Sequence, residues 1–117
     1  MELNWIEITT IDHLNQVDEE SKTKAVLIFK HSTSCGISSM ALNRLETKWK
    51  PEYINQVTPY FLNLLAYRNI SNEIARRYSL LHESPQVLII SNGKCFYDES
   101  HSGIRMDEIL QSLKSAS

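Results

Sequence analysis

The run AVLIF at residues 25–29 places five apolar side chains at consecutive positions. A strand with one solvated face alternates apolar and polar residues, whereas a strand covered on both faces reads as a continuous apolar run. We therefore predict that residues 25–29 form an interior strand with packed structure on each side. This requirement restricts the chain to folds in which a sheet lies between two other layers.

The remaining patterns alternate between strand and helix periods. Asn92-Gly93 separates two β-type runs and supplies the positive φ angles of a type I′ hairpin turn. The resulting order, βαβαβαββα, predicts an α/β fold with a mixed central sheet flanked by helices on both faces. Besides 25–29, we expect strands at residues 5–8, 60–64, 87–90 and 95–97, and helices at 11–21, 35–49, about 71–78 and 104–113.

Helix starts and faces follow from capping residues and apolar spacing. Thr9 or Thr10 is expected to cap the first helix, and Ser71 or Asn72 the third. Pro51 ends the second helix. The inward residues are predicted to be Ile11, Leu14 and Val17 in the first helix, and Ile37, Met40, Ala41 and Leu45 in the second.

Composition narrows the function classes. The chain has 117 residues, of which 42% are hydrophobic, so we expect one domain over residues 1–117. A formal charge of −2 with scattered cations offers no basic field for nucleic acid, and no apolar run approaches the roughly 20 residues that span a bilayer. The start of the chain lacks the pattern of a signal peptide, and two cysteines are too few for a disulfide scaffold. We therefore expect a cytoplasmic protein.

Cys35 stands where the predicted interior strand gives way to a helix, after the polar loop 31–34. The first turn of a helix carries unpaired N–H groups and the positive end of the helix dipole, and both favour a thiolate. Such surroundings lower the pKa of a free thiol from near 8.5 to about 3.5–7.5. Thr33 or Ser34 is expected to cap this helix, and Gly36 keeps the sulfur approachable.

Ser38 lies one helical turn after Cys35, where a second cysteine would close an internal disulfide. Its hydroxyl is expected to hydrogen-bond the thiolate, but it cannot displace a thiol bound to Cys35. Thiol exchange at Cys35 therefore stops at a mixed disulfide until an outside thiol removes the adduct.

An inert thiol is the competing interpretation, because a lone cysteine in a small domain is most often a buried hydrophobe. The polar flank of Cys35 favours reactivity instead. Cys95 follows the hairpin turn within a β-type run, and we predict that it is a packing residue. A resolving role for Cys95 requires its Cα within about 7 Å of that of Cys35.

Several blocks in order resemble the monothiol bacilliredoxins of the thioredoxin-like superfamily, across nearly the whole chain. The resemblance implies a thioredoxin-like fold and a thiol-disulfide oxidoreductase that removes bacillithiol from mixed disulfides on cytosolic proteins. Bacillithiol, or a similar low-molecular-weight thiol, is then a co-substrate, and no tightly bound cofactor is implied. The blocks are residues 29–38, 69–75, 82–87 and 100–101.

Carried over by position, Cys35 resembles the nucleophile, with Gly36, Ile37 and Ser38 completing its motif. Pro85 resembles the cis-proline that faces the nucleophile. A cis bond there would present the backbone of Ser84 to an extended substrate, which pairs with it as an added strand. Family members often have proline where Gly36 stands, so the helix start is freer in this chain.

Charged residues near the predicted strand ends are further candidates. Lys30 and Arg68 are expected to meet the malate carboxylates of bacillithiol by charge complementarity. His31 either holds positive charge near the thiolate or is simply solvated. We expect structural hydrogen bonds for His82 and His101, and no mononuclear metal site.

Two other functions fit parts of the sequence. The C-G-x-S motif at residues 35–38 also resembles the C-G-F-S motif of monothiol glutaredoxins, which carry an iron–sulfur cluster with glutathione. Alternatively, the chain is a binding module that keeps a thioredoxin-like fold without redox turnover. The de-thiolating oxidoreductase is the leading hypothesis.

Overall fold

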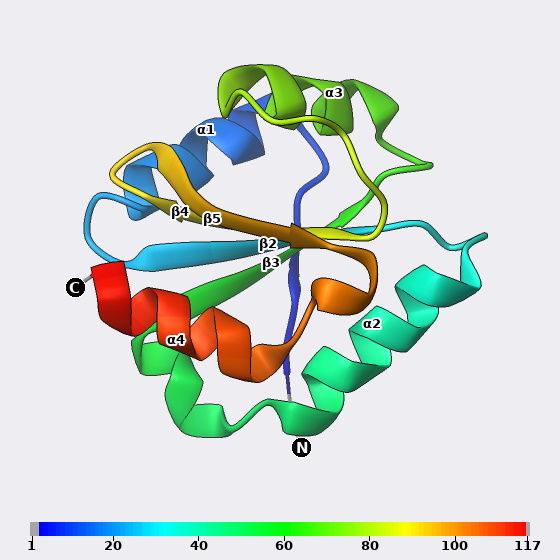
Figure 1. The fold of residues 1–117 in the computed structure, drawn as a ribbon. Coiled ribbons are helices and arrows are strands. Elements are labelled where there is room, and N and C mark those ends of the chain that lie inside the picture. Colours follow the sequence, from blue (N-terminus) through cyan, green and yellow to red (C-terminus); the bar gives the residue numbers. More distant parts are fainter. Residues whose placement is uncertain (1–2, 117) are drawn as a thin grey trace.

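The computed structural model describes residues 3–116 as a five-stranded sheet between two layers of helices (Figure 1). Helices α1 and α3 cover one face of the sheet, and α2 and α4 cover the other. The predicted element order, the mixed sheet and its cover on both faces are confirmed. The bounds are α1 Ile11–Glu20, α2 Gly36–Lys48, α3 Arg68–Arg77 and α4 Met106–Ala116, with short 3-10 helices, not predicted, at Pro51–Asn55 and His101–Gly103.

The sheet has the strand order β1-β3-β2-β4-β5. The first three of these strands in space run parallel, whereas β4 and β5 form an antiparallel hairpin at the other edge. Parallel neighbours require crossover helices, and the hairpin requires only a short turn. The strands are β1 Ile6–Glu7, β2 Ala25–His31, β3 Val57–Asn63, β4 Gln86–Ser91 and β5 Lys94–Ser100.

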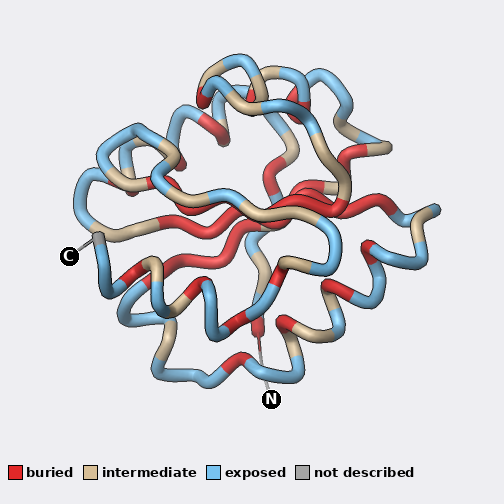
Figure 2. The backbone as a smooth tube through the Cα atoms, in the orientation of Figure 1, coloured by how far each residue is buried: buried red, intermediate tan, exposed pale blue. Residues whose placement is uncertain are grey.

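Strand β2 lies in the middle of the sheet and is buried from Val26 to its end (Figure 2). Leu27 and Phe29 pack into the core under α2 and α4, and Val26 and Ile28 pack into the core under α1 and α3. The strand reaches His31, two residues beyond the predicted run 25–29. Its polar last residues are therefore part of the sheet.

Two predicted boundaries are wrong. Strand β3 begins at Val57, three residues before the predicted start at residue 60, and includes Pro59. The proline is tolerated because β1 pairs only with Tyr60 and Phe61, so Pro59 lies beyond the paired stretch on that side. Helix α3 begins at Arg68 rather than after Ser71, which is buried inside the helix.

The inner face of α2 also differs from the prediction. Ser38, Ala41 and Leu45 are buried at the spacing i, i+3, i+7, as predicted for the two apolar residues. Ile37 and Met40 instead lie on the outside, with 53% and 64% of their surface exposed. The polar Ser38 occupies the inward position of the first turn, and this places its apolar neighbour Ile37 in solvent.

The hairpin turn is confirmed, because Asn92 and Gly93 have φ angles of 53° and 74°. Its tip is held by Ser21, the C-cap of α1, whose carbonyl oxygen accepts from the Asn92 N–H at 2.8 Å. The Ser21 hydroxyl accepts from the Gly93 N–H at 2.9 Å. At the other end of α1, Thr10 is the cap, as expected, although Ile11 is exposed rather than inward.

Alanine at two glycines is expected to change stability in opposite directions. Gly93 has a φ of +74°, a region that costs a residue with a Cβ about 1 kcal/mol or more. Gly36 is helical and has nothing within 4 Å of a Cβ, so Gly36→Ala should raise the free energy of unfolding by about 0.5–1 kcal/mol. Urea denaturation of both variants checks this, and changes of the same sign would contradict it.

Candidate active site

Cys35 is the N-cap residue of α2, with φ −114° and ψ 117°, and its side chain is partly exposed. The loop from β2 closes when the Cys35 N–H donates to the Ser32 carbonyl oxygen at 3.2 Å. The Cys35 carbonyl oxygen then accepts from the Ser39 N–H at 3.2 Å, which opens the helix. The structure therefore gives the capping position to Cys35 itself and not to Thr33 or Ser34, which were the predicted caps.

The helix start presents positive electrostatic potential at Cys35. The N–H groups of the first turn have no intrahelical acceptor, and no side chain caps them. The positive end of the dipole of α2 acts at the same place, so both features favour an anionic sulfur. Gly36 leaves the space beside the sulfur open.

Ser38 does not perform its predicted role. Its hydroxyl lies 2.7 Å from His31 Nδ1 and accepts from the Ser32 N–H at 3.1 Å. The side chain has no exposed surface, and neither contact involves Cys35. Ser38 instead joins the first turn of α2 to the end of β2, which fixes the loop that carries Cys35.

His31 is part of the core, and both readings made from the sequence are wrong. Its ring stacks on Phe29 with centroids 5.9 Å apart and lies 5.4 Å from that of Phe61. Burial lowers the pKa of His31, and the carboxylate of Glu46 opposes this shift only in part. His31 is therefore a buried, neutral imidazole that is hydrogen-bonded to Ser38. It is neither a cation beside the thiolate nor a solvated ring.

The Ser84–Pro85 peptide bond is cis, as the resemblance implies. Pro85 directly precedes β4, which runs antiparallel to β2 and pairs Gln86 with Lys30. The start of β4 and the end of β2 therefore lie side by side at one end of the sheet, the end at which the parallel strands finish. Cys35 follows the last residue of β2 by four positions and Pro85 directly precedes β4, so both belong to loops at this end of the sheet.

The two cations predicted to bind substrate have different surroundings. Arg68 is exposed at the start of α3, which follows the carboxyl end of β3. It therefore lies at the same end of the sheet as Cys35. Lys30 has no exposed surface, and because side chains alternate along a strand it lies on the same face as Val26 and Ile28, the face that α1 and α3 cover. This burial contradicts contact between Lys30 and a substrate carboxylate, because the ammonium group does not reach the surface.

Residues 6–109 match the model of the family described as monothiol bacilliredoxin BrxC. The chain belongs to the BrxC family. A solved structure assigned as a candidate oxidoreductase with a thioredoxin fold is 31% identical, with a TM-score of 0.78 over 92% of this chain and 91% of that chain. Family and fold together place the chain among the thioredoxin-like oxidoreductases, as predicted.

Thioredoxins share the fold of this BrxC-family chain at low identity. The thioredoxin of Malassezia sympodialis is 17% identical, with a TM-score of 0.76 over 97% of this chain and 91% of that chain. The thioredoxin of Fasciola hepatica is 16% identical, with a TM-score of 0.70 over 96% and 99% of the two chains. These likenesses concern the fold alone.

The second cysteine of this BrxC-family chain lies on strand β5 at the far end of the hairpin. Cys95 is partly buried against the core under α1 and α3, and its thiol donates to the Tyr97 carbonyl oxygen at 3.2 Å. Burial raises the pKa of Cys95 to about 11. The predicted packing role of Cys95 is confirmed.

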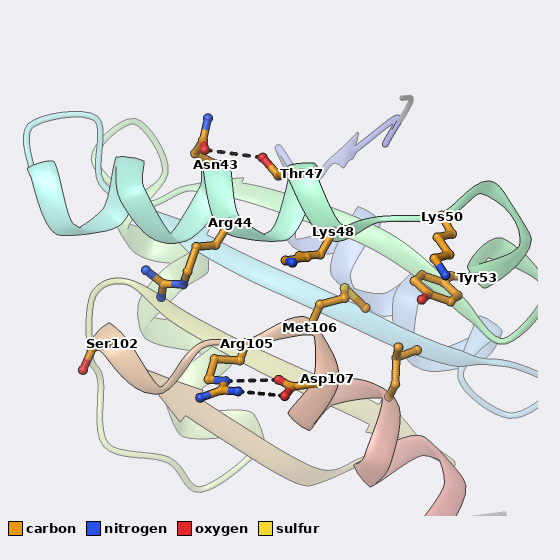
Figure 3. Close-up of a pocket in the computed structure, with 11 residues that line it drawn as sticks. Asn43, Arg44, Thr47, Lys48, Lys50, Tyr53, Ser102, Arg105, Met106 and Asp107 are labelled. Atoms are coloured by element: carbon orange, nitrogen blue, oxygen red, sulfur yellow. Dashed lines mark hydrogen bonds and ion pairs between the residues drawn. The ribbon is translucent and has the colours of Figure 1, made fainter.

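One groove on the BrxC-family chain has no lining residue in the segment around Cys35. This groove of about 820 Å³ runs between α2 and the start of α4 (Figure 3). Arg44 lines it and donates to the Ile104 carbonyl oxygen at 2.9 Å, and Arg105 forms an ion pair with Asp107 at 2.8 Å. The residues of α2 that line the groove begin at Asn43, eight positions and roughly 12 Å along the helix after Cys35. The groove is therefore separate from the candidate site.

Within residues 3–116, no three side chains of the metal-ligating types come together. Over the same residues, every helix is too short or too polar to cross a bilayer.

Sequence reasoning missed one participant in this BrxC-family site and gave another too little weight. Gln86, 2% exposed, directly follows Pro85, and its position in the paired strands was not predicted. His82 was expected only to form a structural hydrogen bond, and it contacts Lys30 Nζ through Nδ1 at 2.9 Å. The signal was the polar tail of an otherwise apolar interior strand, because a buried polar side chain requires a hydrogen-bond partner.

Ser38→Ala is expected to lower the free energy of unfolding by about 1–3 kcal/mol, because it leaves His31 and the Ser32 N–H without their buried partner. Ser39→Ala is the matched control, since Ser39 is exposed one residue later in the same helix and should stay within about 0.5 kcal/mol. Urea denaturation measures both. Equal effects would show that the buried contacts of Ser38 contribute nothing.

Stability is expected to fall as the pH drops below 6.5, the ordinary value for histidine. The folded-state pKa of His31 is lowered, so the unfolded chain binds the proton first and acid favours unfolding. Burial also lowers the pKa of His82, which adds in the same direction. In His31→Gln, unfolding free energies measured from pH 7.5 to pH 5 should fall less steeply than in the wild type, and an unchanged slope would contradict the assignment.

Proposed function

We propose that this chain removes bacillithiol, or a similar low-molecular-weight thiol, from mixed disulfides on other cytosolic proteins through Cys35. The observation that carries the proposal is a partly exposed cysteine at the N-cap of α2 in a member of the BrxC family. The position of Cys35 at the same end of the sheet as the cis bond Ser84–Pro85 supports the proposal. Ser38 in place of a second thiol accounts for a one-cysteine reaction.

The exchange proceeds in two balanced steps. The Cys35 thiolate attacks the bacillithiol sulfur of the mixed disulfide, forms a new S–S bond to it, and releases the substrate protein as a thiolate. A free bacillithiol thiolate then attacks the adduct, which frees Cys35 and yields oxidised bacillithiol. A separate reductase is required to return oxidised bacillithiol to the thiol.

The adduct on Cys35 has no internal route to release. Ser38 carries a hydroxyl, which is a much weaker nucleophile than a thiolate. Its hydrogen bonds are to His31 and Ser32 and not to Cys35. Cys95 has a pKa of about 11, so very little of it is thiolate near neutral pH. External thiol therefore sets the turnover.

Substrate contacts around Cys35 are proposed from exposure and position. Gly36 leaves room beside the sulfur, and Ile37 offers 53% of its surface to an apolar side chain of the substrate. The backbone of Ser84 pairs with an extended substrate segment as an added strand. Arg68, exposed at the same end of the sheet, binds the carboxylates of the low-molecular-weight thiol.

Mixing the purified protein with a bacillithiol-capped protein should move one bacillithiol mass onto Cys35, as measured by intact-mass spectrometry and peptide mapping. Cys35→Ser should lose the transfer entirely, because it removes the only attacking sulfur. Cys95→Ser is the matched control and should transfer as the wild type does. Added free bacillithiol should then strip the adduct.

Two results would count against the proposal. Transfer that persists in Cys35→Ser would place the chemistry elsewhere. A folded wild-type protein that takes up no thiol from the capped substrate would favour a binding module that keeps the fold without the exchange.

A further inference from the structure

Lys30 is a fully buried lysine on the central strand, and the exchange at Cys35 does not use it. Its side chain lies on the α1 and α3 side of the sheet, next in sequence to Phe29, which faces the opposite core. Within residues 3–116, no carboxylate forms an ion pair with it. A buried ammonium group without an acidic partner is rare and needs an explanation.

The contact of Lys30 is to the segment that leads to Pro85. Lys30 Nζ lies 2.9 Å from His82 Nδ1, and the Ser71 hydroxyl lies 3.5 Å from the same nitrogen. Burial and the charge of Lys30 both lower the pKa of His82. The neutral imidazole then accepts a hydrogen bond from the lysine.

A second buried side chain holds the preceding residue of the same segment. Gln86 is the cross-strand partner of Lys30, and its side-chain amide donates to the Leu81 carbonyl oxygen at 3.1 Å. Paired residues of two strands therefore hold consecutive residues, Leu81 and His82. Side chains of paired residues lie on the same face of a sheet, which is why both reach this segment.

Residues 80–85 have no regular secondary structure to fix their own position. Leu81 is 84% exposed, so apolar burial does not hold it either. The end of the segment is tied to the residue that follows β5, because the His101 N–H donates to the Pro85 carbonyl oxygen at 3.1 Å. Gln86 and Lys30 contact residues 81 and 82, and His101 Nε2 lies 3.4 Å from the carboxylate of the next residue, Glu83.

Lys30 is not explained by stability. Burial lowers the pKa of Lys30 to about 8, so at neutral pH the side chain is still an ammonium ion and the fold bears the cost of burying its charge. An apolar side chain of similar length would avoid this penalty. The residue therefore serves something other than stability at neutral pH.

We propose that Lys30 is a positioning residue that holds residues 81–84 through His82, so that the backbone of Ser84 stays in place for substrate pairing beside Cys35. This inference rests on the proposed function. It replaces the direct substrate contact expected of Lys30 from the sequence.

The test compares Lys30→Met with Lys22→Met, a matched change at an exposed lysine of the same chain. Lys30→Met should raise KM for a bacillithiol-capped protein and lower kcat/KM roughly tenfold or more, because the pairing backbone is misplaced. Reaction of Cys35 with a small aromatic disulfide, which needs no strand pairing, should change much less. The midpoint of urea unfolding at pH 7 should not fall.

Two further measurements separate positioning from a general structural effect. Amide hydrogen exchange of residues 81–84 should speed up in Lys30→Met, while exchange in β2 and β4 stays slow. His82→Leu should reproduce the loss in kcat/KM, and the double variant should lose no more than either single one, because both act through one contact.

The inference is overturned if Lys30→Met matches Lys22→Met in kcat/KM and in exchange of residues 81–84. It is also overturned if the variant loses stability and the rate with the small disulfide together, since the role of Lys30 is then general. If the wild type leaves the capped protein untouched, the proposed function fails, and the exchange measurement still decides whether Lys30 positions the segment.

Discussion

The burial of β2 on both faces is the constraint on which the rest of the structure depends. Phe29 and His31 face the core under α2 and α4, and Lys30 between them faces the core under α1 and α3. Because side chains alternate along a strand, one three-residue stretch places polar groups behind both loops of the candidate site. His31 reaches Ser38 in α2, and Lys30 reaches His82 before Pro85. The strand that organises the core thus also aligns the site.

Strand directions explain why distant parts of the sequence meet at Cys35. β3 runs parallel to β2, so α3, whose first residue is Arg68, begins at the end of the sheet where β2 finishes. β4 runs antiparallel to β2, so Pro85, which precedes β4, lies at that same end of the sheet. Ligands of open α/β sheets gather beyond the carboxyl ends of parallel strands, and here the antiparallel strand brings in a third loop.

The fold was predictable because its strongest signals are local. The apolar run 25–29, the Asn92-Gly93 turn and the alternation of periods each have one good structural solution. The candidate nucleophile was also predictable, since a polar loop before Cys35 marks a helix start. Partners of buried polar groups were not, because Ser38 has two plausible acceptors or donors within one turn and sequence spacing does not choose between them. The orientation of Lys30 depended on where β2 ends, and strand ends are the least determined part of a sequence prediction.

Buried polar residues are concentrated at the end of the sheet that carries the site. Of the eight that the described part of the chain contains, only Ser21 and Thr58 lie toward the other end. The two cores on the faces of the sheet are built from apolar side chains, whose burial stabilises the fold. Departures from simple patterning are expected where a protein holds reactive groups in fixed positions. The buried polar groups near Cys35 therefore point to the same candidate site as the cysteine does, and they do so independently of it.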